Sequence, residues 1–356
     1  MKMDNYTRDD RFLEGLCAKL RGGSYDAIFS FDYFPILSAA AQDAGILYLS
    51  WVYDSPHLTL YSNTLGNPCN RVFLFDYAQY ADLEVQGFET VRYLPLPCNV
   101  ARYDRLLAGK TGYLHDISFI GTLYDGADNF YRQIGYLPDS LRGYVEALMT
   151  AQKQIYGMDL LEELKNGDWV HEFAKHVNAD LGPEYRDARA DILMNMLRKE
   201  ITARERREML ELLGNLMQGR GSELALYSGK KPEGLPARYC GIAENQKQMP
   251  EIFRRSRINL NSTLRGIQTG IPLRVIDIMG AGGFCLTNYQ AELAEYFENG
   301  RDLVWYESPE DMREKAEYYL EHDGERERIA ASGRERIAEG FTHERLLTRI
   351  LEETKG

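Results

Sequence analysis

Arg274 and Asp277 stand three residues apart in a short apolar segment, residues 272–280, which begins with a proline and ends at a cluster of glycines. Proline is favoured in the first turn of a helix, so the segment predicts a short helix that carries both charges. The free amide N–H groups of a first turn favour an anion such as phosphate. Arg274 can add a charge-assisted hydrogen bond, and Asp277 can accept hydrogen bonds from hydroxyls. The alternative is a local ion pair worth roughly 0.2–0.5 kcal/mol.

A second polar group follows a strand-like run in SFIGTLYDG, residues 118–126. Gly121 and Thr122 lie where that run ends, so a backbone amide and a hydroxyl are available there to a diphosphate or another anion. An ordinary strand end is the alternative, and the sequence favours neither.

A third polar group lies in SWVYDSPH, residues 50–57, just past another strand-like run. Asp54 and His57 are residue types that act as general bases when a reacting hydroxyl lies beside them. The alternative is loop structure, because Asp-Ser-Pro is also a signal for a turn or a helix start. Asp32, in SFDYFP, is a second candidate for the same cleft.

Alternating strands and helices must position these groups. In the first hundred residues, helical segments separate four short apolar runs, which are residues 26–31, 46–51, 71–76 and 91–96. A second alternating series begins at residue 116 and is interrupted by a long helical stretch, residues 129–218. Continuous apolar strands separated by helices predict parallel sheets that are covered on both faces. We therefore expect an α/β protein with two doubly wound, Rossmann-like domains and ligands bound beyond the carboxyl ends of the strands.

The pattern also predicts domain boundaries. We expect a first domain at residues 1–98, a second at 99–340 that carries a helical insertion at 129–218, and a C-terminal helix at 341–356.

Composition limits the class of protein. The net charge of −12 argues against a general nucleic-acid binder. No run approaches the ~18 apolar residues of a membrane helix, and the N-terminus has no apolar signal segment. The five cysteines are not closely paired in the sequence. Together these features favour a cytoplasmic protein with free thiols. His171 and His176 are five residues apart, so they do not share a helix face, and no DxD pair occurs. We expect no metal cofactor.

The segment from residue 257 to residue 337 carries a wider pattern. A strand ending in Leu-Asn is followed by a loop, then by P-x-R-x-x-[DE]-x-x-x-x-G, a buried strand, a helix that opens near an acidic residue and a leucine, and a late IA-x-x-G-x-x-R-I helix. In this order the segment resembles the C-terminal domain of GT-B glycosyltransferases, and most of all the family of the spore-maturation protein CgeB. SFDYFP, SWVYDSPH and YLPLPCN resemble the first domain of that family.

The resemblance implies a nucleotide-sugar donor held mainly by the second domain and an acceptor approached from the first. It implies that Asp277 binds the ribose hydroxyls of the donor and that Arg274 binds its diphosphate. The remaining donor-site candidates are Gly121 and Thr122 near the diphosphate, Ile242 and Asn245 where this fold reads the base, and Asn261 and Arg265 beside the same cleft. Asn261 has an alternative role as a loop cap.

Two features depart from the family pattern. The chain begins with a helix-like segment, so the first domain is expected to lack its first strand and glycine-rich turn. Retaining members often carry a Glu-x7-Glu signature, but the corresponding positions here are Thr269 and Asp277. The resemblance therefore implies neither a retaining nor an inverting outcome.

The sequence leads to a hypothesis of a cytoplasmic, metal-independent glycosyltransferase of the hexosyltransferase type. It would move a sugar from a nucleoside-diphosphate-sugar to an unknown glycan, protein or small-molecule acceptor. Two alternatives remain, a non-catalytic two-domain protein that binds a nucleotide sugar or a partner, and a nucleotide-sugar epimerase on the same fold. The helical insertion is compatible with a homodimer contact, a shield over the cleft, or an acceptor site.

Overall fold

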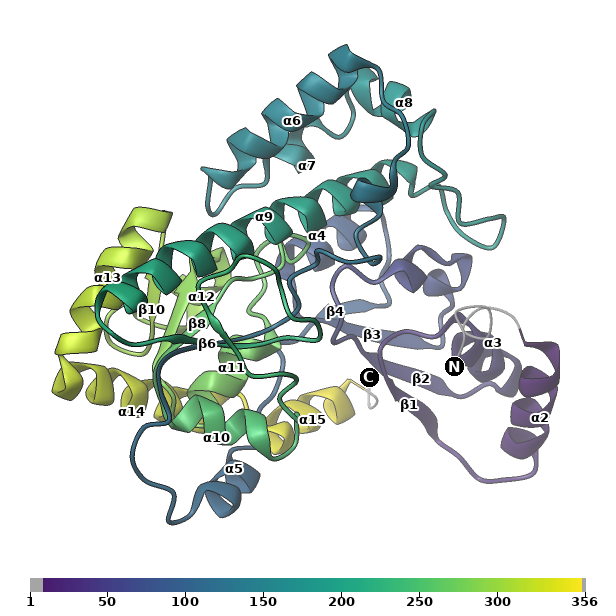
Figure 1. Cartoon of the computed structure of the whole chain (residues 1–356). Helices are drawn as coiled ribbons and strands as arrows, with labels where there is room; N and C mark the ends of the chain where they lie inside the picture. The colour runs from purple at the N-terminus through teal and green to yellow at the C-terminus, as the bar shows by residue number, and fades with distance from the viewer. Residues whose placement is uncertain (1–8, 354–356) are drawn as a thin grey trace.

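The computed structural model describes residues 9–353, which form two parallel sheets and an arm of helices above them (Figure 1). This is the expected α/β class, and the helical nature of the insertion is confirmed. None of the helices in residues 9–353 combines the length and the apolar composition that spanning a membrane requires.

The first domain contains a four-stranded sheet with the order β1-β2-β3-β4, in which all neighbours are parallel. Its elements are α2 (Asp10–Arg21), β1 (Ala27–Phe31), α3 (Pro35–Ala44), β2 (Leu47–Trp51), the short 3-10 helices η1 (Leu58–Tyr61) and η2 (Asn63–Gly66), β3 (Asn70–Leu74), α4 (Tyr77–Val85) and β4 (Val91–Tyr93). Strand β1 forms one edge, and no strand within residues 9–353 lies beyond it.

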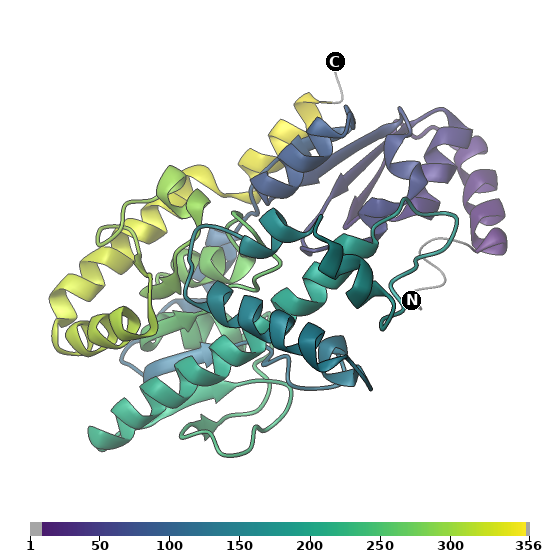
Figure 2. The ribbon, with the colours of Figure 1, turned by 90° about the horizontal axis from the view of Figure 1, so that it is seen from above.

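The two faces of this sheet have different covers. Tyr48 and Val72 belong to a buried cluster that also takes in residues of α3 and α4, whereas Trp51 and Phe73 face the other way. That second face is covered by the C-terminal helix α15 (His343–Glu352), through Leu346 and Ile350. Figure 2 shows α15 beside the first-domain sheet, so the end of the chain returns to the first domain.

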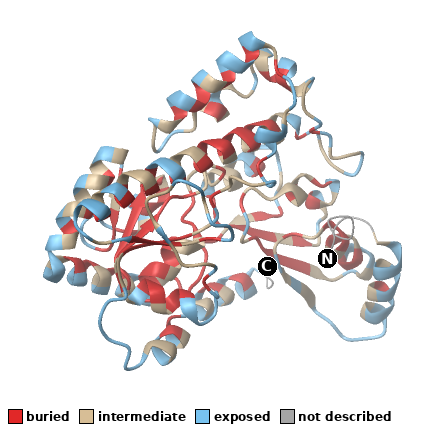
Figure 3. Cartoon of the chain, in the orientation of Figure 1, coloured by how far each residue is buried: buried red, intermediate tan, exposed pale blue. Residues whose placement is uncertain are grey.

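The second domain contains a six-stranded parallel sheet with the order β10-β9-β8-β5-β6-β7. Its elements are α5 (Val100–Leu107), β5 (His115–Ile120), β6 (Leu224–Tyr227), β7 (Arg238–Tyr239), α10 (Gln248–Arg254), β8 (Ser256–Asn261), α11 (Leu273–Gly280), β9 (Cys285–Asn288), α12 (Ala291–Tyr296), β10 (Val304–Tyr306), α13 (Pro309–Glu321) and α14 (Asp323–Gly340). The strands are largely buried (Figure 3), as their apolar runs predict. The chain order reverses between β5 and β8, so the sheet is doubly wound with a switch point there.

The insertion lies between β5 and β6 and has a core of its own. It comprises η3 (Phe130–Gln133), α6 (Asp139–Lys153), α7 (Leu160–Leu164), α8 (Asp168–Ala174) and the 31-residue α9 (Arg189–Gly219). Val145, Phe173 and Leu197 are among its fully enclosed side chains. The second half of α9 packs against the second-domain sheet through Leu210 and Leu213, which ties the insertion to that domain.

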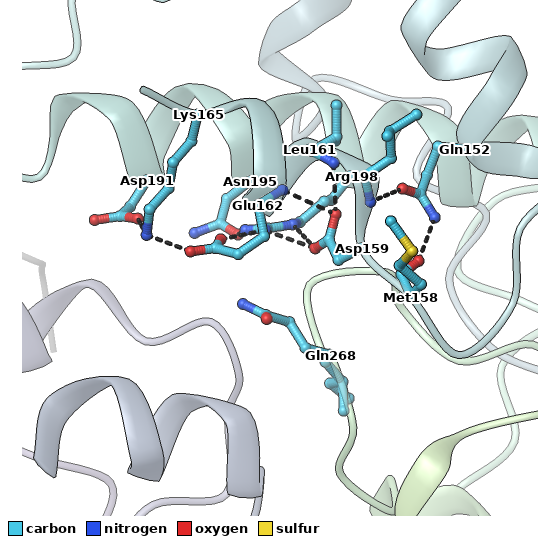
Figure 4. A network of polar contacts seen from close by, with 12 residues as sticks. Gln152, Met158, Asp159, Leu161, Glu162, Lys165, Asp191, Asn195, Arg198 and Gln268 are labelled. Carbon is cyan, nitrogen blue, oxygen red and sulfur yellow. Dashed lines mark hydrogen bonds and ion pairs between the residues drawn. The ribbon is translucent and has the colours of Figure 1, made fainter. Parts of the chain in front are cut away.

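Buried charges lock α7 onto α9 (Figure 4). Arg198 of α9 pairs with Asp159 at 2.6 Å and with Glu162 at 2.7 Å. Lys165 bridges Glu162 and Asp191. Each buried cation here therefore has carboxylate partners.

The turn after α11 needs its glycines. Gly282 has a φ of +76°, a conformation that glycine adopts without strain. A Cβ on Gly283 would lie 2.4 Å from the carbonyl oxygen of Phe253, so β9 packs close only because this position has no side chain.

The two domains meet through buried carboxylates. Asp76, at the end of β3, accepts hydrogen bonds from the backbone amides of Gln268, Thr269 and Gly270 and from the Thr269 hydroxyl, at 2.8–3.2 Å. Glu292 accepts from the Thr269 hydroxyl at 2.8 Å and also binds the first domain. The loop that precedes α11 is thereby fixed to the first domain.

Candidate active site

The switch point places two strand ends side by side in the second domain. Beyond β5 lies the loop 121–126, and beyond β8 lies the loop 262–272. In doubly wound sheets, ligands bind in the crevice at such a point. The loops 121–126 and 262–272 therefore follow the two strands that flank the switch point, and their role in binding a ligand stays a prediction.

Arg206, on α9 of the insertion, spans this point. Its Nη1 donates to the carbonyl oxygen of Thr122 at 2.5 Å, and its Nε and Nη2 donate to the carbonyl oxygen of Ser262 at 3.1 and 2.5 Å. The guanidinium carbon also lies 4.9 Å from the ring centre of Tyr124. No carboxylate in residues 9–353 forms an ion pair with it, and burial lowers the pKa of Arg206. It is a buried cation held by neutral groups.

Arg274 lies in the first turn of α11, as predicted. Its Nη1 approaches the Met249 sulfur at 3.5 Å, and its guanidinium carbon lies 5.6 Å from the ring centre of Phe253. Burial lowers the pKa of Arg274, and nearby Arg206 adds to that effect, whereas Asp277 opposes it. A second cation with little compensation therefore faces the same region.

Asp277 lies one turn further along α11. It accepts a hydrogen bond from the Tyr103 hydroxyl of α5 at 2.8 Å. Burial raises the pKa of Asp277 to about 6, against which the Tyr103 hydrogen bond and Arg274 act. Among the described residues no ion pair joins Arg274 to Asp277, so the two charges are not consumed by the local pair that was the alternative.

The other donor-side candidates differ in whether their polar groups already have partners within the protein. The Gly121 amide donates to the carbonyl oxygen of Tyr227, so that N–H group is already hydrogen-bonded between β5 and β6. Thr122 is exposed, and its carbonyl oxygen receives Arg206. Ile242, which is 73% exposed, and Asn245 lie in an open loop after β7. Thr122 and this loop offer groups to a ligand, whereas the Gly121 amide does not.

Asn261 and Arg265 both have side-chain partners within the fold. The Asn261 amide donates to the hydroxyls of Thr263 and Thr287, which joins β8 to β9. Arg265 pairs with Glu205 at 2.5 Å and donates to the carbonyl oxygen of Ile155. These contacts give both side chains a structural role, and their place in a donor site stays a prediction.

On the first-domain side, Asp32 positions the loop that carries Asp54. Asp32 has a φ of +60°, which is uncommon for a non-glycine residue, and its carboxylate accepts from the amides of Tyr53 and Asp54 at 2.8 and 3.1 Å. The Asp54 side chain is exposed and lines a cavity. Burial raises the pKa of Asp54, and the neighbouring Asp32 charge adds to this effect.

His57 lies in the same loop and is half-buried. Its Nε2 lies 3.3 Å from the Thr59 hydroxyl. Burial lowers the pKa of His57, while Asp32 and Asp54 act against it, so the ring is mostly neutral at pH 7 and able to accept a proton. Of the two base candidates, Asp54 is the one that lines the cavity.

Arg206 was not found from the sequence. It lies in TARERREMLELL, where the pattern of arginine and glutamate predicts a solvated helix face. Arg206 is instead 7% exposed, and the signal that distinguishes it, the absence of a carboxylate partner, is visible only in three dimensions. Within residues 9–353 no group of three or more His, Cys, Asp or Glu side chains is arranged to hold a metal ion.

Comparisons with known proteins bear on this geometry. Residues 189–352 match the family model described as glycosyl transferase-like. Sucrose-phosphate synthase from Thermosynechococcus elongatus is similar in structure, with a TM-score of 0.52 at 11% identity over 97% of this chain and 77% of that one. The Anabaena protein HepE in complex with UDP has a TM-score of 0.51 at 10% identity, over 97% and 82% of the two chains.

The fold is GT-B. A TarM variant of S. aureus, in a complex that includes UDP, has the same architecture, with a TM-score of 0.52 at 11% identity over 97% of this chain and 59% of that one. No curated protein sequence matches the chain significantly. The GT-B architecture places Arg206, Arg274 and Asp277 on the second domain and Asp54 on the first.

Proposed function

We propose that the protein is a metal-independent glycosyltransferase that moves a sugar from a nucleoside-diphosphate-sugar to a hydroxyl acceptor. One observation carries the proposal, namely that the buried Arg206 and the half-buried Arg274 are cations near the switch point with no carboxylate ion pair among the described residues. A buried charge is stable only when it is compensated. A diphosphate at this point would supply the missing negative charge.

The arginines would act on the leaving group. As the bond between the sugar C1 and the diphosphate oxygen breaks, the electron pair moves to the diphosphate, and negative charge develops there. Arg274, the amides at the start of α11 and the exposed Thr122 hydroxyl would stabilise that charge in a site that excludes water. Fixed cations of this kind can take the role that a metal ion has in other transferases.

The remaining roles divide between the domains. Asp277 would accept the ribose hydroxyls, and the loop that holds Ile242 and Asn245 would contact the base. Asp54, with His57 as the second candidate, would take the proton of the acceptor hydroxyl as its oxygen forms the new bond to C1. Asp32 would act as a positioning residue, because it holds the Asp54 loop.

The comparisons support this proposal and suggest the first donor to try. HepE has been crystallised with UDP and with UDP-glucose. The matched family model covers the part of the chain that contains Arg206, Arg274 and Asp277. UDP and UDP-glucose are therefore the first ligands to test.

The proposal is tested by thermal-shift titration with UDP, GDP, TDP and ADP, followed by turnover of the matching sugar donor. A diphosphate at a hundred times its dissociation constant should add roughly 2.7 kcal/mol to the free energy of unfolding. Asp54→Asn should retain that shift and lose transfer to acceptor. Binding without any turnover would contradict the transferase and favour a binding protein, and isomerised donor without acceptor would favour an epimerase.

A further inference from the structure

A cavity of about 660 Å³ lies where the insertion meets the first domain. Asp54 and Leu58 of the first domain form one wall, and Tyr124 and Leu264 come from the loops at the switch point. The rest of the wall comes from the insertion. A space of this volume holds a small organic molecule, because ligand pockets usually measure about 300–1,000 Å³.

Apolar side chains dominate the lining of this cavity. The first domain contributes Leu58, the loop after β8 contributes Leu264, and the insertion contributes Phe130, Ile134, Val177 and Met196 among others. Phe130 is 60% exposed. A ligand with a largely apolar body would therefore pack well against these side chains.

Several polar side chains in the lining are engaged within the protein, whereas the buried hydroxyl of Ser55 has no hydrogen-bond partner among the described residues. Lys199 pairs with Asp128 at 3.4 Å and donates to its carbonyl oxygen at 2.9 Å. Asn195 accepts from Arg198, and the Asp180 carboxylate accepts from the Gly182 amide. Asp54 differs, because its backbone amide binds Asp32, its side chain is exposed, and the residue lines the cavity.

We propose that this cavity, which we call the insertion cavity, is the acceptor site, and that it takes a neutral, hydroxyl-bearing molecule with a largely apolar body. This inference rests on the proposed function and names the chemical class of its acceptor. The hydroxyl would face Asp54 while the apolar body lies against Phe130 and Met196.

The insertion cavity is joined to the donor region through one residue. Tyr124 lines the cavity, and its ring also stacks with the Arg206 guanidinium at 4.9 Å. An acceptor in the cavity therefore lies next to the place proposed for the diphosphate. In the transfer, the acceptor O–H bond breaks and its proton passes to Asp54, the acceptor oxygen bonds to C1, and the nucleoside diphosphate leaves with the electron pair.

Two other acceptor classes fit the lining less well. An anionic acceptor such as a phosphorylated alcohol would face the carboxylates of Asp54 and Asp180, with Lys199 already paired. A glycan would leave many hydroxyls without partners beside aliphatic side chains, and each buried unpaired hydroxyl weakens binding. The paired state of Lys199 and the aliphatic side chains of the wall favour a neutral molecule with a largely apolar body.

The first test compares acceptors of the three classes. Transfer from UDP-glucose, or from the nucleotide sugar whose diphosphate binds, is measured with geraniol and 2-naphthol, with methyl glucoside, and with glycerol 3-phosphate. We expect the apolar alcohols to accelerate nucleotide release at least tenfold over hydrolysis of the donor by water. Acceleration by methyl glucoside or glycerol 3-phosphate alone would overturn the inference.

The second test uses Phe130→Asp, with Tyr136→Asp as its matched control. Tyr136 is also an exposed aromatic residue of the insertion, at 67%, but it does not line the cavity. Because both rings are exposed, both variants should fold with the thermal stability of the wild type. Phe130→Asp should raise the KM for geraniol at least tenfold and reduce binding of the uncharged dye Nile red, with UDP affinity unchanged.

The outcomes separate this inference from the proposed function. Equal effects of Phe130→Asp and Tyr136→Asp on KM and on dye binding would overturn the apolar acceptor, even if UDP binds and UDP-glucose turns over. Loss of dye binding in Phe130→Asp alone supports the apolar cavity. Failure of every nucleoside diphosphate to bind would overturn the transferase.

Discussion

The insertion and the switch point both contain buried arginines, but the two regions treat them differently. In the insertion, burial acts to lower the pKa of Arg198, yet Asp159 and Glu162 outweigh it and the pKa lies above its ordinary value (Figure 4). Arg265, in the loop after β8, behaves in the same way because of Glu205. Arg206 and Arg274, near the switch point, have no carboxylate ion pair among the described residues, so burial prevails and their pKa values are lowered.

This difference distinguishes structural cations from cations that await a ligand. A paired arginine has its negative charge within the protein, so its removal should cost stability and leave binding unchanged. An arginine held by carbonyls, sulfur and aromatic rings lacks that charge, so its removal should cost little stability and weaken the binding of an anion. The following predictions test this distinction.

The largest effect is expected from Arg198→Met. The substitution leaves Asp159 without its cation and Glu162 with Lys165 alone, which should lower the free energy of unfolding by about 3–5 kcal/mol. Urea denaturation measures this loss. The control is Arg189→Met, which removes an exposed pair with Asp187 and should change stability by less than about 1 kcal/mol. Equal losses in the two variants would contradict the distinction.

Arg265→Met should lower the free energy of unfolding by somewhat less, about 3 kcal/mol, because only Glu205 loses its partner. The affinity for UDP, measured by calorimetric titration, should stay within about twofold of the wild type. A tenfold loss of UDP affinity without a loss of stability would place Arg265 in the donor site.

Asp277 provides a test through pH. Its folded pKa of about 6 lies above the ordinary value of 3.8, so the neutral form is favoured by folding. That stabilisation is complete below about pH 4 and is lost as the pH rises through 6. Relative to Asp277→Asn, the wild type should therefore lose on the order of 2 kcal/mol between pH 4 and pH 7. Parallel stability curves for the two proteins would show that the carboxyl is not perturbed.

The smallest effect on stability is expected from Arg274→Gln. No ion pair in the described residues is lost, so the free energy of unfolding should change by less than about 1 kcal/mol, and relief of the buried charge can make the change favourable. Thermal melts beside Arg254→Gln, an exposed residue of the neighbouring α10, provide the comparison. A loss above 2 kcal/mol in Arg274→Gln alone would make Arg274 a structural residue.

Much of the fold follows from the sequence because its signals are local. Apolar runs and Pro272 each act within a few residues, and they predicted the parallel strands and the short helix. The placement of Arg274 and Asp277 on that helix followed in the same way.

The rest depends on partners that are distant in the chain. Arg265 meets Glu205 sixty residues away, and Asp76 meets the amides of residues 268–270 about 190 residues away. Nothing near Arg265 or Asn261 in the sequence shows that its side chain is engaged, and nothing near Arg206 shows that it lacks a carboxylate. Structural and ligand-binding roles of these residues can therefore be told apart only once the fold is known.

The central claim, that Arg274 awaits a diphosphate, is tested most directly by calorimetric titration of UDP and uridine into the wild type, Arg274→Gln and Arg254→Gln. A charge-assisted contact contributes about 1.5–3 kcal/mol, so the wild type should bind UDP far more tightly than uridine, and Arg274→Gln should lose roughly 10–100-fold in UDP affinity while uridine binds as before. Arg254→Gln should match the wild type. Equal affinity for UDP and uridine in the wild type, or an unchanged affinity for UDP in Arg274→Gln, would contradict the account.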